Sequence, residues 1–398
     1  MTDRPYDIVV FGATGFTGGL TAEYLARRAT PTRHNPLTRW ALAGRNRAKL
    51  EQTRTHLETI EPATADLDLI EADIGDRDSM RRVADCTKVV ITTVGPYIRY
   101  GEPLVAACAE AGTDYVDLCG EPEFVDRMWL KYHARATETG ARLVHSCGFD
   151  SIPHDLGVRY TVERLPEGMP ITVEGFVRTN GTFSGGTYHS TVEILSRLRK
   201  SKQAASERRR LEPRPHGRIV KGLTRPPHHD ETGGGWVVAP PLIDPLVVLR
   251  SARALDRYGP EFRYAHYIVV KRLPTLAVLG AGAATMVTLA QLKPTRDLLL
   301  KFKDQGDGPS AAQRGRSWFN VRFKGEGGGR RVIAEVSGGD PGYGETSKML
   351  AEAALCLAHD ELPQTAGQVT PAVAMGHALT ERLVNAGIRF ATVTDEAA

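Results

Sequence analysis

Short hydrophobic runs alternate with longer amphipathic stretches over the first 150 residues of the chain. Six of the runs end at polar or glycine-containing turns, which is typical of strands. These predicted strands cover residues 6–13, 39–45, 67–73, 88–95, 114–118 and 141–148. The stretches between them place apolar residues three and four positions apart, which is typical of helices. Strands that alternate with helices over short connections predict a parallel sheet with helices on both faces.

The pattern becomes more mixed after residue 155. Alternation of apolar and polar residues predicts strands at 171–181, 263–273 and 331–339. Helical spacing predicts helices around 187–200, 244–256 and 275–292. We therefore divide the chain into a parallel-sheet domain at 1–155, an α+β domain at 156–342 and a helical segment at 343–398. The fold class is α/β, and the helical C-terminal segment is expected to pack back on the first domain.

One apolar segment, 273–292, has no charged residue over its whole length. About 20 apolar residues are enough to span a bilayer as a helix. The segment is rich in Gly, Ala and Thr, however, which favour membrane insertion only weakly. We interpret it first as a buried or amphipathic helix. Peripheral membrane contact is the main alternative, and a true membrane span is the least favoured one.

Composition and charge point to a protein of the reducing cytosol. The net charge of +4 is small for 398 residues and gives no reason to expect a nucleic-acid partner. The five cysteines are scattered and none forms a C-x-x-C pair, so neither a disulfide framework nor a zinc site is expected. The N-terminus is polar and has no apolar signal core. We therefore expect a cytoplasmic protein, with peripheral membrane association as the alternative.

Positive charge is concentrated between Arg197 and Arg225. This stretch holds eleven Lys or Arg residues and two Glu residues, interspersed with Pro, Gly and Ser. Such a run is typical of a solvated loop. The alternative is a docking patch for an acidic partner, whose approach it would accelerate.

Three glycines follow the first predicted strand, in the sequence VVFGATGFTG at residues 9–18. In this arrangement Gly12 permits a tight turn, Gly15 lets the backbone approach a pyrophosphate, and Gly18 lets the next helix pack closely on the strand. The helix N-terminus then presents free N–H groups to the phosphates, and the Thr14 and Thr17 hydroxyls can add donors. A predicted strand precedes the glycines and a predicted helix follows them, so we infer a Rossmann-type dinucleotide site.

The end of the second predicted strand indicates which dinucleotide is bound. An NAD site normally places Asp or Glu there to bind the ribose hydroxyls, but this strand ends in AGRN with no carboxylate. Arg45 can instead bind a 2′-phosphate through charge-assisted hydrogen bonds. The predicted cofactor is therefore NADPH. Asp73, at the end of the third strand, is interpreted either as an adenine contact or as a turn residue.

Three residues are candidate proton donors. Tyr97 follows the rigid Gly95-Pro96 turn after the fourth strand, where the nicotinamide ribose is expected; its alternative role is that of a packing aromatic. Tyr188 and His189 lie beyond a pair of glycines at a predicted helix start. Two other polar residues, Asp150 and His154, lie in the turn after the sixth strand, and we interpret this turn mainly as a helix start.

Two further patterns are set aside. Tyr267 and Lys271 have the Tyr-x-x-x-Lys spacing of short-chain reductases, but they lie on a predicted strand, where residues four apart are about 13 Å apart. No metal site is predicted, because the cluster 228–230, HHD, stands alone in a predicted loop.

Several motifs together resemble the saccharopine dehydrogenase-like oxidoreductases. They are GATGFTG, AGRN, TTVGPY, YVDLCGE, CGFDSIPHDLG, SGGT, GYGET and TPAVAMGHALTERLVNAGIRF. The resemblance covers nearly the whole chain and is strongest to the branch that includes the trans-acting enoyl reductases of mycobacterial lipid synthesis. It is specific for the family and much less specific for the reaction.

The resemblance implies both a cofactor site and a reaction. Family residues that bind the cofactor correspond here to Gly12, Thr14, Gly15, Phe16, Thr17, Gly95 and Pro96. The implied reaction is NADP-dependent reduction of a C=C bond in an acyl or polyketide lipid, carried on a partner synthase that lacks this step. The alternatives are an amino-acid or imine dehydrogenase of the saccharopine type and an NADP-binding sensor or scaffold without activity. For saccharopine-type chemistry we expect several convergent arginines in the second domain, and outside 197–225 none could be identified.

Overall fold

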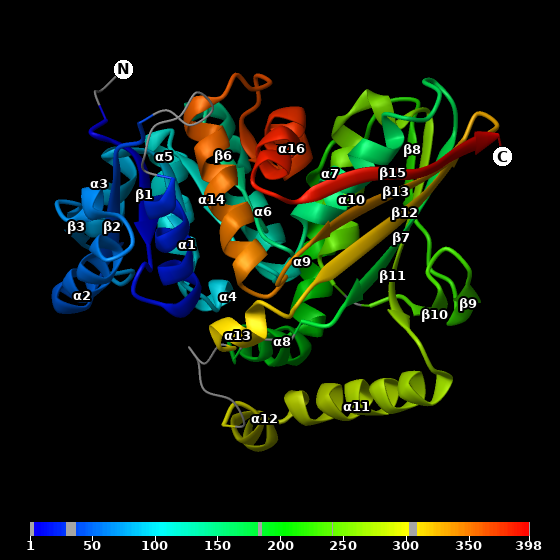
Figure 1. Cartoon of the computed structure of the whole chain (residues 1–398), viewed down its shortest axis with the longest axis horizontal. Coiled ribbons are helices and arrows are strands. Elements are labelled where there is room, and N and C mark those ends of the chain that lie inside the picture. Colours follow the sequence, from blue (N-terminus) through cyan, green and yellow to red (C-terminus); the bar gives the residue numbers. More distant parts are fainter. Residues whose placement is uncertain (1–3, 29–36, 182–184, 241, 302–308, 398) are drawn as a thin grey trace.

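The computed structural model describes residues 4–28, 37–181, 185–240, 242–301 and 309–397. Two sheets lie side by side in it (Figure 1). The first has seven strands in the order β14-β6-β5-β4-β1-β2-β3, all parallel. Their bounds are β1 Tyr6–Phe11, β2 Trp40–Gly44, β3 Asp68–Glu71, β4 Thr87–Thr92, β5 Asp114–Asp117, β6 Arg142–Val144 and β14 Gly367–Val369. The order from β3 to β6 is that of the Rossmann fold, as the sequence predicts.

Helices cover both faces of this sheet. They are α1 Phe16–Arg27, α2 Arg47–Glu58, α3 Arg77–Asp85, α4 Tyr97–Tyr100, α5 Glu102–Ala111, α6 Pro122–Thr139 and α14 Gly344–His359, with a short 3-10 turn at Pro62–Thr64. Successive residues of β1 enter different cores: Ile8 and Val10 belong to one hydrophobic cluster, Val9 and Phe11 to another. Both faces of the strand are therefore buried, which explains why its sequence is continuously hydrophobic.

The second sheet has eight strands and is mixed. Its order is β15-β13-β12-β7-β11-β10-β9, and β8 also pairs with β11. The bounds are β7 Ile171–Thr179, β8 Ile219–Gly222, β9 His228–Asp230, β10 Gly235–Val238, β11 Glu261–Val270, β12 Phe319–Gly327, β13 Arg330–Gly338 and β15 Arg389–Ala397. Helices α7 (Ile152–Val162) and α10 (Asp244–Ala254) pack against it, and a 3-10 turn at Asp256–Tyr258 follows α10.

The C-terminal segment contains helices and packs back on the first domain, as predicted, and it also supplies two strands. It contains the helices α14, α15 (Pro371–Ala374) and α16 (Gly376–Asn385), and α14 packs against α1, β4 and β5 of the first sheet. It also supplies one strand to each sheet, since β14 pairs with β6 and β15 pairs with β13. The sequence did not predict these two strands, because β14 has only three residues, too few for a periodic pattern, and because β15 lies at a sheet edge and is mostly exposed.

The basic stretch also differs from its prediction. The helix α8 (Gly185–Ser196) overlaps the helix predicted around 187–200, whereas α9 (Leu198–Leu211) occupies the first part of the stretch interpreted as a solvated loop and packs on α6. The stretch is ordered because its arginines pair with acidic residues of α6: Arg197 contacts Glu123 at 2.8 Å and Arg208 contacts Asp126 at 3.2 Å.

The apolar segment forms the helix α11 (Leu273–Gln291), followed by α12 (Lys293–Leu299) and, further on, α13 (Ala311–Arg314). Among the described residues, α11 is the one helix long and apolar enough to cross a membrane. Only 8% of its apolar window is buried, so the interpretation as a buried helix is wrong. Figure 1 shows α11 and α12 lying apart from both sheets, and α11 contacts α8, α12 and the strand β11 that precedes it in the chain.

Candidate active site

The turn after β1 has the close packing that its glycines predict. Gly12 adopts φ +93°, and a Cβ there would lie 2.7 Å from Val94 Cγ2. A Cβ on Gly18 would lie 2.1 Å from the Gly12 carbonyl oxygen and 2.8 Å from Thr93 Oγ1. Neither position can hold a larger residue without movement of the backbone. The N-terminus of α1 is therefore held directly against the end of β1.

This N-terminus is open in front of the helix. Gly15 is the N-cap and makes no side-chain cap, and a Cβ there would meet only the Gly12 carbonyl oxygen, at 3.4 Å. Thr14 and Gly15 are exposed. The first N–H groups of α1 thus face free space at the positive end of the helix dipole, which suits the pyrophosphate of a dinucleotide.

Residues from later parts of the chain pack against the start of α1. Phe16 begins α1, and its ring meets the edge of Tyr343 with the ring centres 4.7 Å apart. The Arg314 guanidinium lies 5.6 Å from the centre of the Phe16 ring. Arg314 is a candidate contact that the sequence reasoning missed, because α13 is remote from the glycines in the chain. The predicted contact of Phe16 with the cofactor stays a prediction.

Arg45 and Asp73 differ in whether their side chains already have partners within the protein. Arg45 is exposed directly after β2, and it pairs with no carboxylate among the residues that the structure describes. Its guanidinium is thus available for a 2′-phosphate. The Asp73 carboxylate accepts the Gly75 N–H at 2.8 Å, which is the turn role that the sequence allowed. An adenine contact by Asp73 stays a prediction.

Replacing Arg45 with alanine is expected to weaken NADPH binding by roughly ten- to a hundredfold, the cost of one charge-assisted contact. NADH binding should change little, because it lacks the 2′-phosphate. Fluorescence titration with both dinucleotides measures this. Arg47→Ala is the matched control, since Arg47 is occupied with Glu51 and the Leu69 carbonyl. A wild type that binds NADH as tightly as NADPH would contradict the assignment.

Tyr97 is anchored at the carboxyl end of β4. The Gly95-Pro96 bond that precedes it is cis, and Glu121 accepts the N–H groups of Tyr97 and Ile98 at 2.9 and 2.8 Å. The Tyr97 hydroxyl donates to the Thr92 carbonyl at 3.2 Å and accepts the Leu118 N–H at 3.1 Å. Burial raises its pKa well above the ordinary value. These contacts favour the packing role, which was the alternative interpretation.

Tyr188 and His189 lie on α8, near the same edge of the sheet. The Tyr188 hydroxyl donates to the Leu299 carbonyl at 3.1 Å, so it joins α8 to α12. The Ser190 hydroxyl, on the next residue, contacts the Glu121 carboxylate at 3.4 Å. This places α8 beside Tyr97 and the start of α6. Roles for Tyr188 and His189 in proton transfer stay predictions.

A polar cluster that the sequence reasoning missed lies beyond β6. His154 is on the first turn of α7, Asp244 begins α10 and His266 is on β11, and all three are buried. His154 Nδ1 lies 2.9 Å from the Asp244 carboxylate, and the two imidazole ring centres are 4.9 Å apart. The turn residue Asp150 is close enough for both Asp244 and His154 to shift its pKa. Asp150 and His154 were noticed in the sequence, but their partners come from other domains of the chain.

The electrostatics of this cluster suit proton transfer near neutral pH. Burial, then the charge of Asp244, raises the pKa of Asp150 to about 7. Burial opposes ionisation of Asp244 as well, but His154 and His266 outweigh it and hold the Asp244 pKa below its ordinary value. Burial lowers the pKa of His266 to about 4. A partly buried carboxyl that is half protonated at pH 7 is a candidate acid.

The turn that carries Asp150 is held rigidly. The buried Asp117 carboxylate, at the end of β5, accepts the N–H groups of Cys119 and Ser146, both at 2.9 Å, and pairs with His145 Nδ1 at 2.7 Å. Ser146 adopts φ +63°, a strained conformation for a residue other than glycine. A Cβ on Gly120 would lie 3.8 Å from the Asp150 carboxyl, so the turns after β5 and β6 meet at Asp150.

The cluster also bears on the prediction that the chain has no metal site. The residues considered for metal binding, His228–Asp230, form strand β9 and not a loop. His154, Asp244 and His266 offer ligand atoms that all lie within 4.8 Å of one another. The expected absence of a metal site therefore stays a prediction. The sequence could not indicate this group of possible ligands, because its three residues lie on separate elements, α7, α10 and β11.

Comparisons with known proteins show similarity over the first sheet and over the whole chain. The family described as saccharopine dehydrogenase NADP binding domain matches residues 8–144. A Mycobacterium tuberculosis protein provisionally named a trans-acting enoyl reductase is 38% identical over 425 residues, covering 98% of each chain. The trans-acting enoyl reductase of Mycobacterium ulcerans is 34% identical, covering 97% of each chain, and the saccharopine dehydrogenase-like oxidoreductase of Rattus norvegicus is 32% identical, covering 98%.

Among solved structures, apo saccharopine dehydrogenase (L-Glu forming) from Saccharomyces cerevisiae aligns with a TM-score of 0.50. The alignment covers 98% of this chain and 100% of that one, at 11% sequence identity. At this identity the likeness shows a shared fold and nothing about the substrate.

Proposed function

Because the chain belongs to the saccharopine dehydrogenase-like oxidoreductases and carries their NADP-binding domain, we propose that it is an enoyl reductase acting in trans on a lipid or polyketide chain. The observation that carries this proposal is the full-length similarity to relatives named for that activity. The cluster around Asp150 supports it, because reduction of an enoyl group needs a proton as well as a hydride.

In this proposal NADPH supplies the hydride to the β-carbon of the enoyl thioester. Protonated Asp150 gives its proton to the α-carbon, so that the C=C bond becomes a C–C single bond with one new hydrogen at each end. The Asp244 carboxylate beside Asp150 favours the protonated carboxyl by raising its pKa, and His154 partly opposes this effect. Phe149 packs on His154 with the ring centres 5.4 Å apart and limits access of water to the pair.

A lipid substrate is consistent with the exposed helix α11. Leu273 is 50% exposed and Leu292, directly after the helix, is 63% exposed. Lys271 and Arg272 precede α11, and Lys293 follows it. We propose that α11 contacts an apolar acyl chain or the surface of an anionic membrane, with these cations at the lipid headgroups.

A carrier partner is proposed to meet the exposed part of α9. Arg209 and Arg210 are exposed there, whereas Arg208 is buried and paired with Asp126 and Glu212. Of these three consecutive arginines, Arg209 and Arg210 can therefore attract an acidic carrier domain at the surface, and their effect should weaken at high salt.

A second candidate function is an imine dehydrogenase of the saccharopine type. The observation that favours it is a set of convergent arginines, Arg208, Arg250 and Arg253, which line one pocket. Such a set suits a substrate that bears carboxylates. The sequence did not indicate this set of arginines, because Arg208 lies on α9 and the other two lie on α10, and only the fold brings the two helices together.

NADPH oxidation with a series of substrates tests the proposal. The purified protein should reduce a medium or long enoyl thioester faster than a crotonyl-length one, because a longer apolar chain buries more surface on binding. A carrier-bound enoyl chain should be a better substrate than its soluble thioester at low salt. Turnover of an oxo acid plus amine, with none of the enoyl thioesters, would replace the enoyl reductase proposal with the second candidate.

A further inference from the structure

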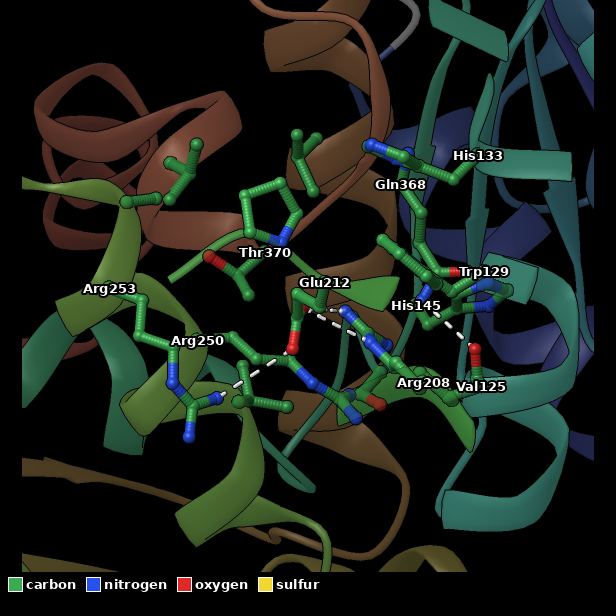
Figure 2. Close-up of a pocket in the computed structure, with 16 residues that line it drawn as sticks. Val125, Trp129, His133, His145, Arg208, Glu212, Arg250, Arg253, Gln368 and Thr370 are labelled. Carbon is green, nitrogen blue, oxygen red and sulfur yellow. Dashed lines mark hydrogen bonds and ion pairs between the residues drawn. The ribbon is translucent and has the colours of Figure 1, made fainter. Parts of the chain in front are cut away.

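A pocket of about 240 Å³ lies at the carboxyl ends of β6 and β14 (Figure 2). His145 follows β6 directly, Val369 ends β14, and α6, α9 and α10 supply the remaining walls. Figure 2 shows Arg208, Arg250 and Arg253 gathered around it with Glu212 between them. None of these side chains belongs to the glycine turn or to the Asp150 cluster, so the pocket is a separate feature of the same sheet edge.

The pocket has more arginines than carboxylates to pair with them. Asp126 pairs with Arg250 and, at 3.2 Å, with Arg208. Glu212 pairs with Arg208 at 2.7 Å but lies 3.9 Å from the Arg253 guanidinium. Two carboxylates thus serve three cations, and Arg253 has the weakest partner. Its side chain is 34% exposed, so it can still reach a ligand.

Burial is the main cause of the lowered pKa values around the pocket, and repulsion between neighbouring cations adds to it. Burial, then the nearby Arg250, lowers the pKa of Arg208 to about 10. Burial is also the main cause of the lowered pKa of Arg253, and Arg250 and Arg209 lower it further. Burial and then Arg208 lower the pKa of His133. An anion in the pocket would offset this repulsion.

Two histidines line the pocket. His133 Nδ1 accepts the Gln368 N–H at 3.0 Å, so its proton is on Nε2, which becomes a donor. His145 Nδ1 is taken by Asp117, and its Nε2 is buried with no hydrogen-bond partner among the described residues. Trp129 stacks on His133 with ring centres 5.0 Å apart and holds Arg208 at 4.9 Å from its own ring centre. The donors are therefore held in place before any ligand binds.

We propose that this pocket is an oxyanion-binding site that receives a phosphate or carboxylate group of the substrate, with Arg250, Arg253 and His145 as the main contacts. The helix α10 joins it to the proposed reaction centre, because Asp244 begins that helix and Val247, Arg250 and Arg253 follow at intervals of three. Asp117 also joins the two, since it binds His145 and raises the pKa of Asp150. The proposal holds for either candidate reaction, and the identity of the anion separates them.

The test is a titration of the NADP+-saturated protein with inorganic phosphate and, separately, with glutarate. Saturation with NADP+ keeps both probes out of the dinucleotide site. Tryptophan fluorescence reports binding, and Trp129→Phe should remove the signal because Trp129 lies in the pocket wall. Arg253→Ala should weaken binding roughly tenfold or more, the loss of one charge-assisted contact. Arg135→Ala, which removes an exposed arginine of α6 outside the pocket, should bind like wild type.

Two further probes identify the source of the anion. Tighter binding of pantetheine 4′-phosphate than of pantetheine would assign the site to the phosphate of a carrier arm. Tighter binding of glutarate than of any phosphate would assign it to a carboxylate substrate, and either result supports an oxyanion site. No fluorescence change with any probe, or equal weakening in Arg253→Ala and Arg135→Ala, would overturn the proposal. None of these measurements uses turnover, so they stand even if enoyl reduction is not observed.

Discussion

Replacing Asp150 with asparagine is expected to lower kcat by roughly 10²- to 10⁴-fold, the usual contribution of a positioned general acid. Asparagine keeps the size of the side chain but has no proton to give at this position. NADPH binding should be retained, because Asp150 is not part of the glycine turn. Stopped-flow measurement of NADPH oxidation under saturating substrate separates the chemical step from binding. An unchanged kcat with intact folding would remove Asp150 from the reaction.

The same residue predicts how the rate depends on pH. Asp150 is protonated below its pKa of about 7, so kcat should fall as the pH rises through 7, and this fall should be absent in Asp150→Asn. Asp155 is the matched control. Burial raises its pKa to about 7 as well, but its carboxylate accepts the Ala372 N–H at 2.8 Å inside the protein. Asp155→Asn should therefore keep the fall in kcat around pH 7.

The same substitution, Asp150→Asn, should lower activity but raise the stability of the folded protein above neutral pH. Because the folded-state pKa of Asp150 lies above its unfolded value, folding must pay for a buried carboxylate once the pH exceeds 7. The penalty is absent below the unfolded pKa and complete above the folded one. Asp150→Asn is therefore expected to unfold at a higher temperature than wild type at pH 8 and at a similar temperature at pH 4. This pattern would also show that the loss of activity is not a loss of fold.

Gly18→Ala is expected to weaken NADPH binding by roughly a hundredfold or more. The added Cβ would lie 2.1 Å from the Gly12 carbonyl oxygen, a backbone atom that cannot turn away. The start of α1 must then move, and the loss of two charge-assisted bonds to the phosphates, at about 1.5–3 kcal/mol each, accounts for the change. Calorimetric titration with NADPH measures the affinity, and thermal unfolding shows whether the first sheet still forms.

Gly19→Ala is the control for this variant because it lies on the same helix, one residue further on. A Cβ there would come no closer than 3.8 Å to another atom, the Ala13 carbonyl oxygen. The substitution should leave NADPH binding unchanged and stabilise α1 by up to about 1 kcal/mol, because alanine favours helix more than glycine. Equal affinities for the two variants would show that close packing at Gly18 is not needed for the cofactor.

Much of the cofactor site was predictable because its signals are local. Gly12, Gly15 and Gly18 lie within one turn, and their roles depend on the strand before them and the helix after them. The strand β1 is buried on both faces, and this appears in the sequence as an unbroken run of hydrophobic residues. The choice of NADPH is likewise predictable from one short stretch, because the end of β2 carries Arg45 and no Asp or Glu.

The remaining features depended on contacts between distant segments. His154, Asp244 and His266 meet because α7 and α10 pack on the second sheet, and burial together with the charge of Asp244 brings the Asp150 pKa to about 7. Arg208 reads as one more cation of a basic stretch until Asp126 and Glu212 are seen to pair with it. The exposure of α11 likewise depends on which faces the other helices already cover. The sequence alone thus determined the dinucleotide-binding turn and the parallel sheet, because local spacing encodes both. The tertiary structure decided where charge is buried, because burial is a property of the assembled chain.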